Sequence, residues 1–214
     1  MSRFLLPTPQ VVVAYQELRS RVVELLRSVP ESEGDRAVPH CPAWTVRDLV
    51  AHMVGIPEDI LAGRMEGVTT DAWTHAQVER HRGESLHELA SSFESSREQF
   101  DSVLPMIPAP TNSQLVMDAV THEHDLRHAL GRPGARDSSA VAVGVGWLLD
   151  MAERNAPGLA SVLSAPGTDR FEVMRTMSGR RSPEQIARMG FDEGQILSLL
   201  IGTPLKPPAV SIEE

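Results

Sequence analysis

Apolar residues recur at three- and four-residue spacing along most of this chain, and no stretch alternates apolar and polar residues. In residues 8–28 the apolar stripe comprises Val11, Tyr15, Leu18, Val22, Leu25 and Leu26. This spacing places the stripe on one face of a helix, whereas a half-buried strand would alternate. With 214 residues, the chain is long enough to bury a sizeable core. We therefore predict an all-α fold.

Capping residues and helix breakers predict where the first helices begin and end. Thr8 is expected to cap the helix over 8–28, with Pro9 at its first position. Thr45 followed by Asp48 resembles a capping box that begins a second helix. Gly55 and Pro57 are expected to end or bend this second helix, with a short continuation beyond them.

The rest of the chain also carries helical patterns, and residues 29–41 are predicted to form a loop. Short connections favour an antiparallel bundle. We predict a helix bundle over 1–155 and a mostly helical extension packed on it over 156–214. The further helices are expected at 69–104 with a break near Gly83, at 112–130, at 138–154, at 171–178, from Ser182 onward, and at 194–202.

Charge and cysteine content narrow the classes of partner. The net charge of −9 argues against a nucleic-acid binder and against binding to an anionic membrane surface. Cys41 is the single cysteine, which excludes an intrachain disulfide and fits a cytosolic compartment. Neither a signal peptide nor a membrane-length apolar run is recognised. We expect a cytoplasmic monomer or homodimer that acts on a small molecule.

Two of the predicted helices carry residues that could hold a metal ion. In the 112–130 helix, His122 falls within the apolar sector and Asp118 lies at its margin, one turn apart. His52 lies at the rim of the apolar face of the second helix. Two imidazoles and one carboxylate leave positions open, which is more typical of catalytic than structural sites. Taken singly, an Asp–His pair is more often an ion pair and a rim histidine more often a hydrogen-bonded core residue.

Other polar residues near this cluster have less specific interpretations. Asp125 is expected nearer to water, with the alternative role of orienting His122. His124 and His128 are expected on the solvated face. Cys41 has no obvious partner, so a buried or idle thiol is favoured over a soft-metal ligand or a nucleophile.

The stretch His40-Cys41-Pro42-Ala43-Trp44-Thr45-Val46-Arg47-Asp48-Leu49-Val50-Ala51-His52 resembles the opening signature of the mycothiol-dependent maleylpyruvate isomerase family, within the DinB-like metal-binding superfamily. Similarity to the family continues in residues 71–78, 118–134 and 171–182. The resemblance therefore touches most of the chain. Its Trp-Thr-Val-Arg-Asp-Leu…His and His-x-x-Asp-Leu-Arg-x-x-Leu-Gly elements are fairly specific together.

This resemblance implies a four-helix bundle that holds one divalent metal on two histidines and one acidic residue. The family's histidines fall on His52 and His122, and its acidic residue, often Glu, falls on Asp118. Zinc is the expected metal, and iron(II), nickel and manganese suit the same ligands. The resemblance also implies mycothiol as a thiol cosubstrate in an isomerase or a thiol S-transferase.

The chain departs from the family at two places. Asp118 is one methylene shorter than Glu. Too few residues lie between the helix ending near residue 154 and Phe171 for the strands of the sterol-carrier-like domain that relatives often carry, so the extension over 156–214 looks trimmed. Arg180 and Arg181 are weak candidates for binding a carboxylate of thiol or substrate, the alternative being a solvated pair beside a turn. A binding module without turnover and a metal-dependent enzyme that no longer uses mycothiol both stay open.

Overall fold

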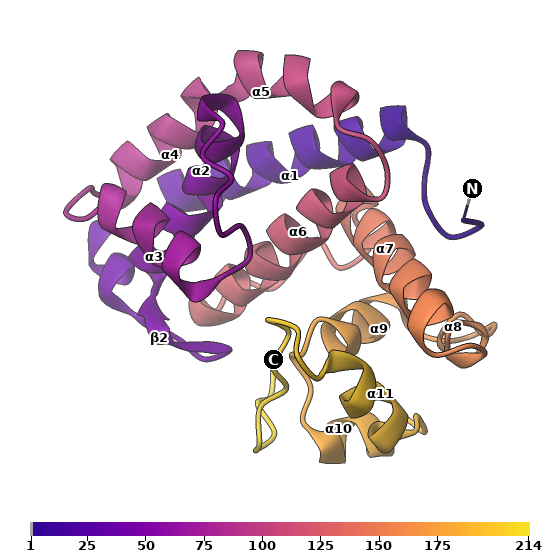
Figure 1. Ribbon diagram of the computed structural model, residues 1–214. Helices are drawn as coiled ribbons and strands as arrows, with labels where there is room; N and C mark the ends of the chain where they lie inside the picture. The colour runs from indigo at the N-terminus through magenta and orange to yellow at the C-terminus, as the bar shows by residue number, and fades with distance from the viewer. Residues whose placement is uncertain (1) are drawn as a thin grey trace.

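The computed structural model describes residues 2–214 and confirms the all-α prediction. Four helices form the bundle: α1 (Thr8–Ser28), α2 (Val46–Ala62), α4 (Leu86–Ser95) and α6 (Thr111–Ala129). Helix α1 packs against α4 and α6, and α2 packs against the same two helices, so the four close into a ring (Figure 1). The helices predicted from spacing therefore form the DinB-like bundle.

The remaining helices cover this bundle. Helix α3 lies on α2, α7 lies on α1 and α6, and α9 packs on α7. Figure 1 shows α8 to α11 gathered beside the far half of α7. Their bounds are α3 (Asp71–Arg80), α5 (Arg97–Val103), α7 (Ser139–Asn155), α8 (Leu159–Leu163), α9 (Arg170–Met177), α10 (Pro183–Arg188) and α11 (Glu193–Leu200), with 3-10 turns at Glu31–Asp35 and Leu104–Met106.

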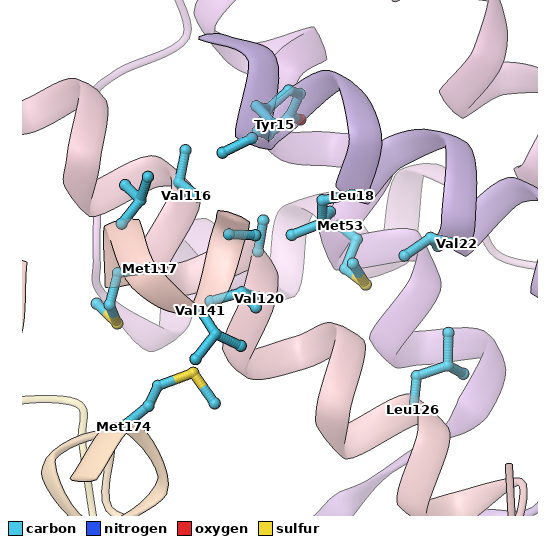
Figure 2. Packing of buried hydrophobic residues seen from close by; sticks show 14 of the residues in the cluster. Tyr15, Leu18, Val22, Met53, Val116, Met117, Val120, Leu126, Val141 and Met174 are labelled. Carbon is cyan, nitrogen blue, oxygen red and sulfur yellow. The ribbon is translucent and has the colours of Figure 1, made fainter. Parts of the chain in front are cut away.

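One hydrophobic core joins the bundle to the helices that follow it. Figure 2 shows Leu18 of α1, Met53 of α2 and Val120 of α6 in the cluster that also contains Val141 of α7 and Met174 of α9. Burying an aliphatic side chain of this size stabilises the fold by roughly 1.5–3 kcal/mol. The C-terminal helices are therefore held to the bundle by apolar packing. The proposed boundary at residue 155 stays a prediction.

The caps confirm some predicted helix ends and correct one. Thr45 and Asp48 form a reciprocal capping box at the start of α2, and Ser182 with Gln185 forms another at the start of α10. The predicted Thr8 cap is wrong, because α1 already includes Thr8 and Pro7 precedes it without a side-chain hydrogen bond.

Helix α2 continues through Gly55 and Pro57, so the predicted end of this helix is wrong. Both residues are buried, so tertiary packing outweighs the missing N–H donor of the proline, and Gly55 faces α3. A Cβ atom at Gly55 would lie 2.6 Å from Cβ of Gln77 on α3. The glycine therefore permits the close approach of α3.

The β hairpin and helix α8 were not predicted. The expected loop over 29–41 contains strand β1 (Ala37–Val38), which pairs antiparallel with β2 (Cys41–Thr45). Strands this short carry no measurable alternation, and α8 is likewise too short to show a helical period. The hairpin lies against α6 and brings residues 40–44 beside the polar face of that helix. Among the helices of residues 2–214, none combines the length and the apolarity needed to cross a membrane.

A buried histidine links the end of α3 to α2. The Nε2 atom of His81 lies 3.0 Å from Oε2 of Glu58, and its Nδ1 atom lies 3.0 Å from Oε1 of Glu84. The hydrogen bond to Glu58 raises the pKa of His81, although burial opposes it, and Glu84 adds to the increase.

We expect this interaction to make stability depend on pH. Because the pKa of His81 is raised in the folded state, its stabilisation is complete below the unfolded value of about 6.5 and is lost as pH rises through the folded value. In urea titrations, the native protein should lose more unfolding free energy between about pH 6 and pH 8.5 than His81→Gln does. Equal losses in the two proteins would contradict this assignment.

Candidate metal centre

The side chains of His52, Asp118 and His122 converge between α2 and α6. The Nε2 atom of His52 lies 3.7 Å from Oδ2 of Asp118, and Nε2 of His122 lies 3.7 Å from Oδ1 of the same carboxylate. The two imidazole rings stand edge to face, with their centroids 5.0 Å apart. The three residues that the sequence proposes as ligands therefore face a common point.

The donor set fits a divalent ion. A separation of 3.7 Å is too long for a hydrogen bond, and Oδ2 of Asp118 is buried with no hydrogen-bond partner among residues 2–214. Two ligands of one tetrahedral zinc ion, each bonded at about 2.1 Å, lie about 3.4 Å apart. An ion between these atoms would satisfy the unpartnered oxygen with little movement of the side chains.

The ring of His52 is oriented by a chain of hydrogen bonds that leads away from the centre. Its Nδ1 atom lies 2.7 Å from Oε1 of Gln77, and Nε2 of Gln77 donates to Asp59 at 2.8 Å. Because a carboxylate only accepts, Asp59 fixes the amide so that its oxygen faces His52. Nδ1 of His52 then carries the proton, and the Nε2 lone pair points at Asp118. Arg64 and Arg80 hold Asp59 in turn.

The ring of His122 faces a carboxylate on its other side, at a geometry that does not make a hydrogen bond. Its Nδ1 atom lies 3.3 Å from Oδ2 of Asp125. The predicted position of Asp125 near water is wrong: it is fully buried and binds Arg175 at 2.8 Å and Arg180 at 2.7 Å. Burial alone would raise the pKa of Asp125, but the two guanidinium groups outweigh it and hold that pKa well below its usual range. An ionised carboxylate therefore faces the imidazole.

Asp118 provides the open side of the centre. Its side chain is 35% exposed, against 6% for His52 and 10% for His122. Burial acts to raise the pKa of Asp118, yet His122 and then His52 lower it below its ordinary value. The carboxylate is therefore ionised at neutral pH, and solvent or a small molecule can approach from its side.

Trp44 and Cys41 of the β hairpin flank the two histidines. The Trp44 ring centroid lies 5.2 Å from that of His52 and 5.9 Å from that of His122. The Sγ atom of Cys41 lies 3.7 Å from Oδ2 of Asp125. Burial, followed by the charge of Asp125, raises the pKa of Cys41 to about 12. This thiol stays protonated, which agrees with the favoured interpretation of a half-buried, unreactive cysteine.

Two other groups of potential ligands are less suited to a cation. The group Cys41, His122 and Asp125 uses a carboxylate that Arg175 and Arg180 already neutralise. The second group comprises His40, His128 and Glu214, and its carboxylate is bound by Arg175 and Arg181. A cation in either place would compete with guanidinium groups, so the group around Asp118 is favoured.

The solvated positions predicted for several polar residues are wrong. His124 is buried against the Phe171 ring, with centroids 4.7 Å apart, and burial lowers its pKa to about 3. His128 is only half buried and lies beside the His40 ring. The C-terminal helices cover this side of α6, and a face calculation on one isolated helix could not show that.

Arg180 and Arg181 are buried as well, so the solvated alternative for this pair is wrong. Both bind carboxylates, but the carboxylates belong to the chain itself. Arg180 binds Asp125, and Arg181 binds Glu172 and Glu214. A role for the pair in binding a ligand stays a prediction.

Sequence reasoning missed Gln77, Asp59 and Arg175. All three are buried, but their residue types are mostly exposed in proteins, so nothing in their local pattern marks them. The indirect signal was Gly55, one turn beyond His52, where a helix needs a reason to lack a side chain.

A family model described as Mycothiol maleylpyruvate isomerase N-terminal domain matches residues 15–132, more than half of the chain. The matched range contains all three converging residues and ends before α7. No curated protein and no solved structure matches the chain. The family match supports a mycothiol-related protein of the DinB-like metal-binding type.

We expect His122→Ala to abolish stoichiometric binding of zinc. The variant removes one of three ligands, leaving a pair too weak to retain the ion through dialysis. His75→Ala is the matched control, because the His75 side chain is 72% exposed and lies on α3 away from the cluster. Metal content after loading and dialysis, measured by mass spectrometry, checks the prediction. Equal zinc in both variants would remove His122 from the site.

We expect Gln77→Leu to weaken zinc affinity about 10- to 100-fold, since the partner that orients a histidine ligand typically has an effect of this size. Competition with a chromogenic chelator measures the affinity. Gln114→Leu serves as the control, because Gln114 lies on α6 with a half-buried side chain and makes no hydrogen bond to the three ligands. Unchanged affinity in Gln77→Leu would mean that His52 needs no outer support.

Proposed function

The chain belongs to the mycothiol maleylpyruvate isomerase N-terminal domain family, and on that premise we propose that it is a metal-dependent enzyme. Its thiol cosubstrate is mycothiol, and its electrophilic substrate is a small molecule. The reaction is either cis–trans isomerisation or thiol S-transfer. Zinc is the preferred metal, and nickel, iron(II) or manganese suit the same donors.

One observation carries this proposal: three donor atoms face one point, and the carboxylate side is open to solvent. A structural zinc site would close all four positions with protein ligands, whereas three ligands leave room for an exogenous atom. The buried partners of the histidines support the same interpretation: Gln77 holds the His52 ring in one orientation through a hydrogen bond, and the Asp125 carboxylate faces Nδ1 of His122 at 3.3 Å.

A divalent ion at this place would supply Lewis acidity that lowers the pKa of a thiol, so that thiolate exists near neutral pH. His52, Asp118 and His122 would hold it. Trp44 excludes water from the side of the two imidazoles, while the exposed edge of Asp118 admits the reactants. Cys41 keeps its own proton and takes no part in nucleophilic attack.

Both reactions follow from attack of the mycothiol sulfur on an electron-poor carbon. The thiol loses its proton to solvent, and sulfur forms a bond to one alkene carbon while the π electrons move to the adjacent acceptor group. Rotation about the resulting single bond and cleavage of the C–S bond return mycothiol and give the trans isomer. Protonation of the adduct without cleavage gives a stable conjugate. Where the electrophilic carbon carries a leaving group such as chloride, the C–S bond forms as the C–Cl bond breaks and chloride leaves, which is the outcome of S-transfer.

We expect the zinc-loaded protein to accelerate one of two reactions of mycothiol: isomerisation of maleylpyruvate, or conjugation of monochlorobimane. Absorbance and fluorescence measure the rates, and His122→Ala should lower the catalysed rate at least about 100-fold because the site loses a ligand. His75→Ala should retain the native rate. If neither reaction exceeds the uncatalysed rate with zinc, nickel, iron(II) or manganese, the protein is a binding module or acts without mycothiol.

A further inference from the structure

A second polar cluster lies behind the metal centre, where the C-terminal helices meet α6 and the β hairpin. It contains three buried guanidinium groups and three carboxylates that neutralise them. The cations belong to Arg175, Arg180 and Arg181, and the carboxylates to Asp125, Glu172 and Glu214.

Two arginines and one histidine contact the Glu214 carboxylate, although Glu214 lies outside any helix or strand. Arg175 donates to it from Nε at 3.0 Å and also from Nη2. Arg181 donates to Oε2 at 3.3 Å, and Nε2 of His40 lies 2.6 Å from Oε1. The side chain is only 6% exposed. Burial raises its pKa, but His40 and Arg175 outweigh this and lower it well below the ordinary value, so the group is ionised.

The other two carboxylates are committed elsewhere. Asp125 accepts hydrogen bonds from Nε and Nη2 of Arg180 and from Arg175, and Glu172 accepts two from Arg181. With Glu214 the cluster has three positive and three negative groups; without it, three positive groups would face two negative ones. Each guanidinium would keep one carboxylate partner, but three buried positive groups would share only two negative ones, so the vacated place would attract an anion.

The segment that carries Glu214 is held less firmly than the groups that bind it. Residues 203–214 contain no helix or strand. Apart from Glu214, the segment is held by Leu205, which packs against the core, and near its end by hydrogen bonds between Ser211 and Ser182, from Ser211 to Glu184 and from Gln185 to the Ile212 carbonyl. The arginines lie on and just after α9, which packs on α7. The end of the segment can therefore move Glu214 out of the cluster while Arg175 and Arg181 stay in place.

We propose that Arg175, Arg181 and His40 form a binding site for the carboxylate of a small molecule, and that Glu214 fills this site as an internal competitor. The parallel N–H donors of a guanidinium group suit a carboxylate. The site adjoins the metal centre, because Arg175 binds Asp125, and Asp125 faces His122. The binding site itself requires neither metal nor turnover.

Calorimetric titration of the metal-free protein with succinate tests the site. We expect Glu214→Ala to bind succinate at least about tenfold more tightly than the native chain, because the internal competitor is gone. Glu213→Ala is the matched control, since Glu213 is 76% exposed and lies 4.0 Å from surface Arg188. It should bind succinate as the native chain does. Succinamide, which has the same skeleton without charge, should not bind to any of the proteins.

Two further variants keep the test decisive. Arg181→Gln added to Glu214→Ala should abolish the gain in affinity. Glu214→Gln keeps the shape of the side chain without its charge and should give a smaller gain, which serves if Glu214→Ala does not show native circular dichroism. The proposal is overturned if both Glu214 variants bind succinate no better than Glu213→Ala, or if the gain survives Arg181→Gln. Because no metal is present, neither result depends on the proposed catalytic activity.

Discussion

The metal centre depends on one constraint: each imidazole has its Nδ1 atom directed outward, so that its Nε2 atom faces Asp118. For His52 the outward partner is Gln77, and for His122 it is Asp125. A histidine ring free to rotate would present either nitrogen, and only one of them can reach the common point. The packing of α3 on α2 and of the C-terminal helices on α6 positions the groups that make these two contacts. Gly55 lets α3 approach α2 closely enough for Gln77 to reach His52.

On each side of the centre, a buried aspartate is neutralised by two arginines. Asp59 is buried behind Gln77 and bound by Arg64 and Arg80, while Asp125 is buried behind His122 and bound by two arginines from the C-terminal part. The C-terminal helices therefore do more than cover apolar surface, because they supply the cations that keep Asp125 ionised. This gives a physical reason for the chain to retain a helical extension beyond the family-matched region, which ends at residue 132.

Local patterns predicted the bundle and the three candidate ligands that converge in it, and long-range packing decided the rest. Spacing within single helices located His52, Asp118 and His122, since each needs only its own helix to define its face. The same calculation failed for Asp125 and His124, because α6 is covered on both sides and has little solvated face. Their partners come from helices about 50 residues later in the chain. No periodicity within α6 records that contact.

The departure from the family at Asp118 is compatible with this geometry. Aspartate is one methylene shorter than the glutamate often found in relatives, so its carboxylate stays closer to the α6 backbone. In this structure Oδ1 faces His122 and Oδ2 faces His52 at equal distances of 3.7 Å, so the short side chain lies midway between the two imidazoles. A carboxylate held back in this way leaves more space on the solvent side, where the side chain is 35% exposed. The shorter side chain therefore preserves the donor set and leaves open the side through which, in the proposed function, reactants would enter.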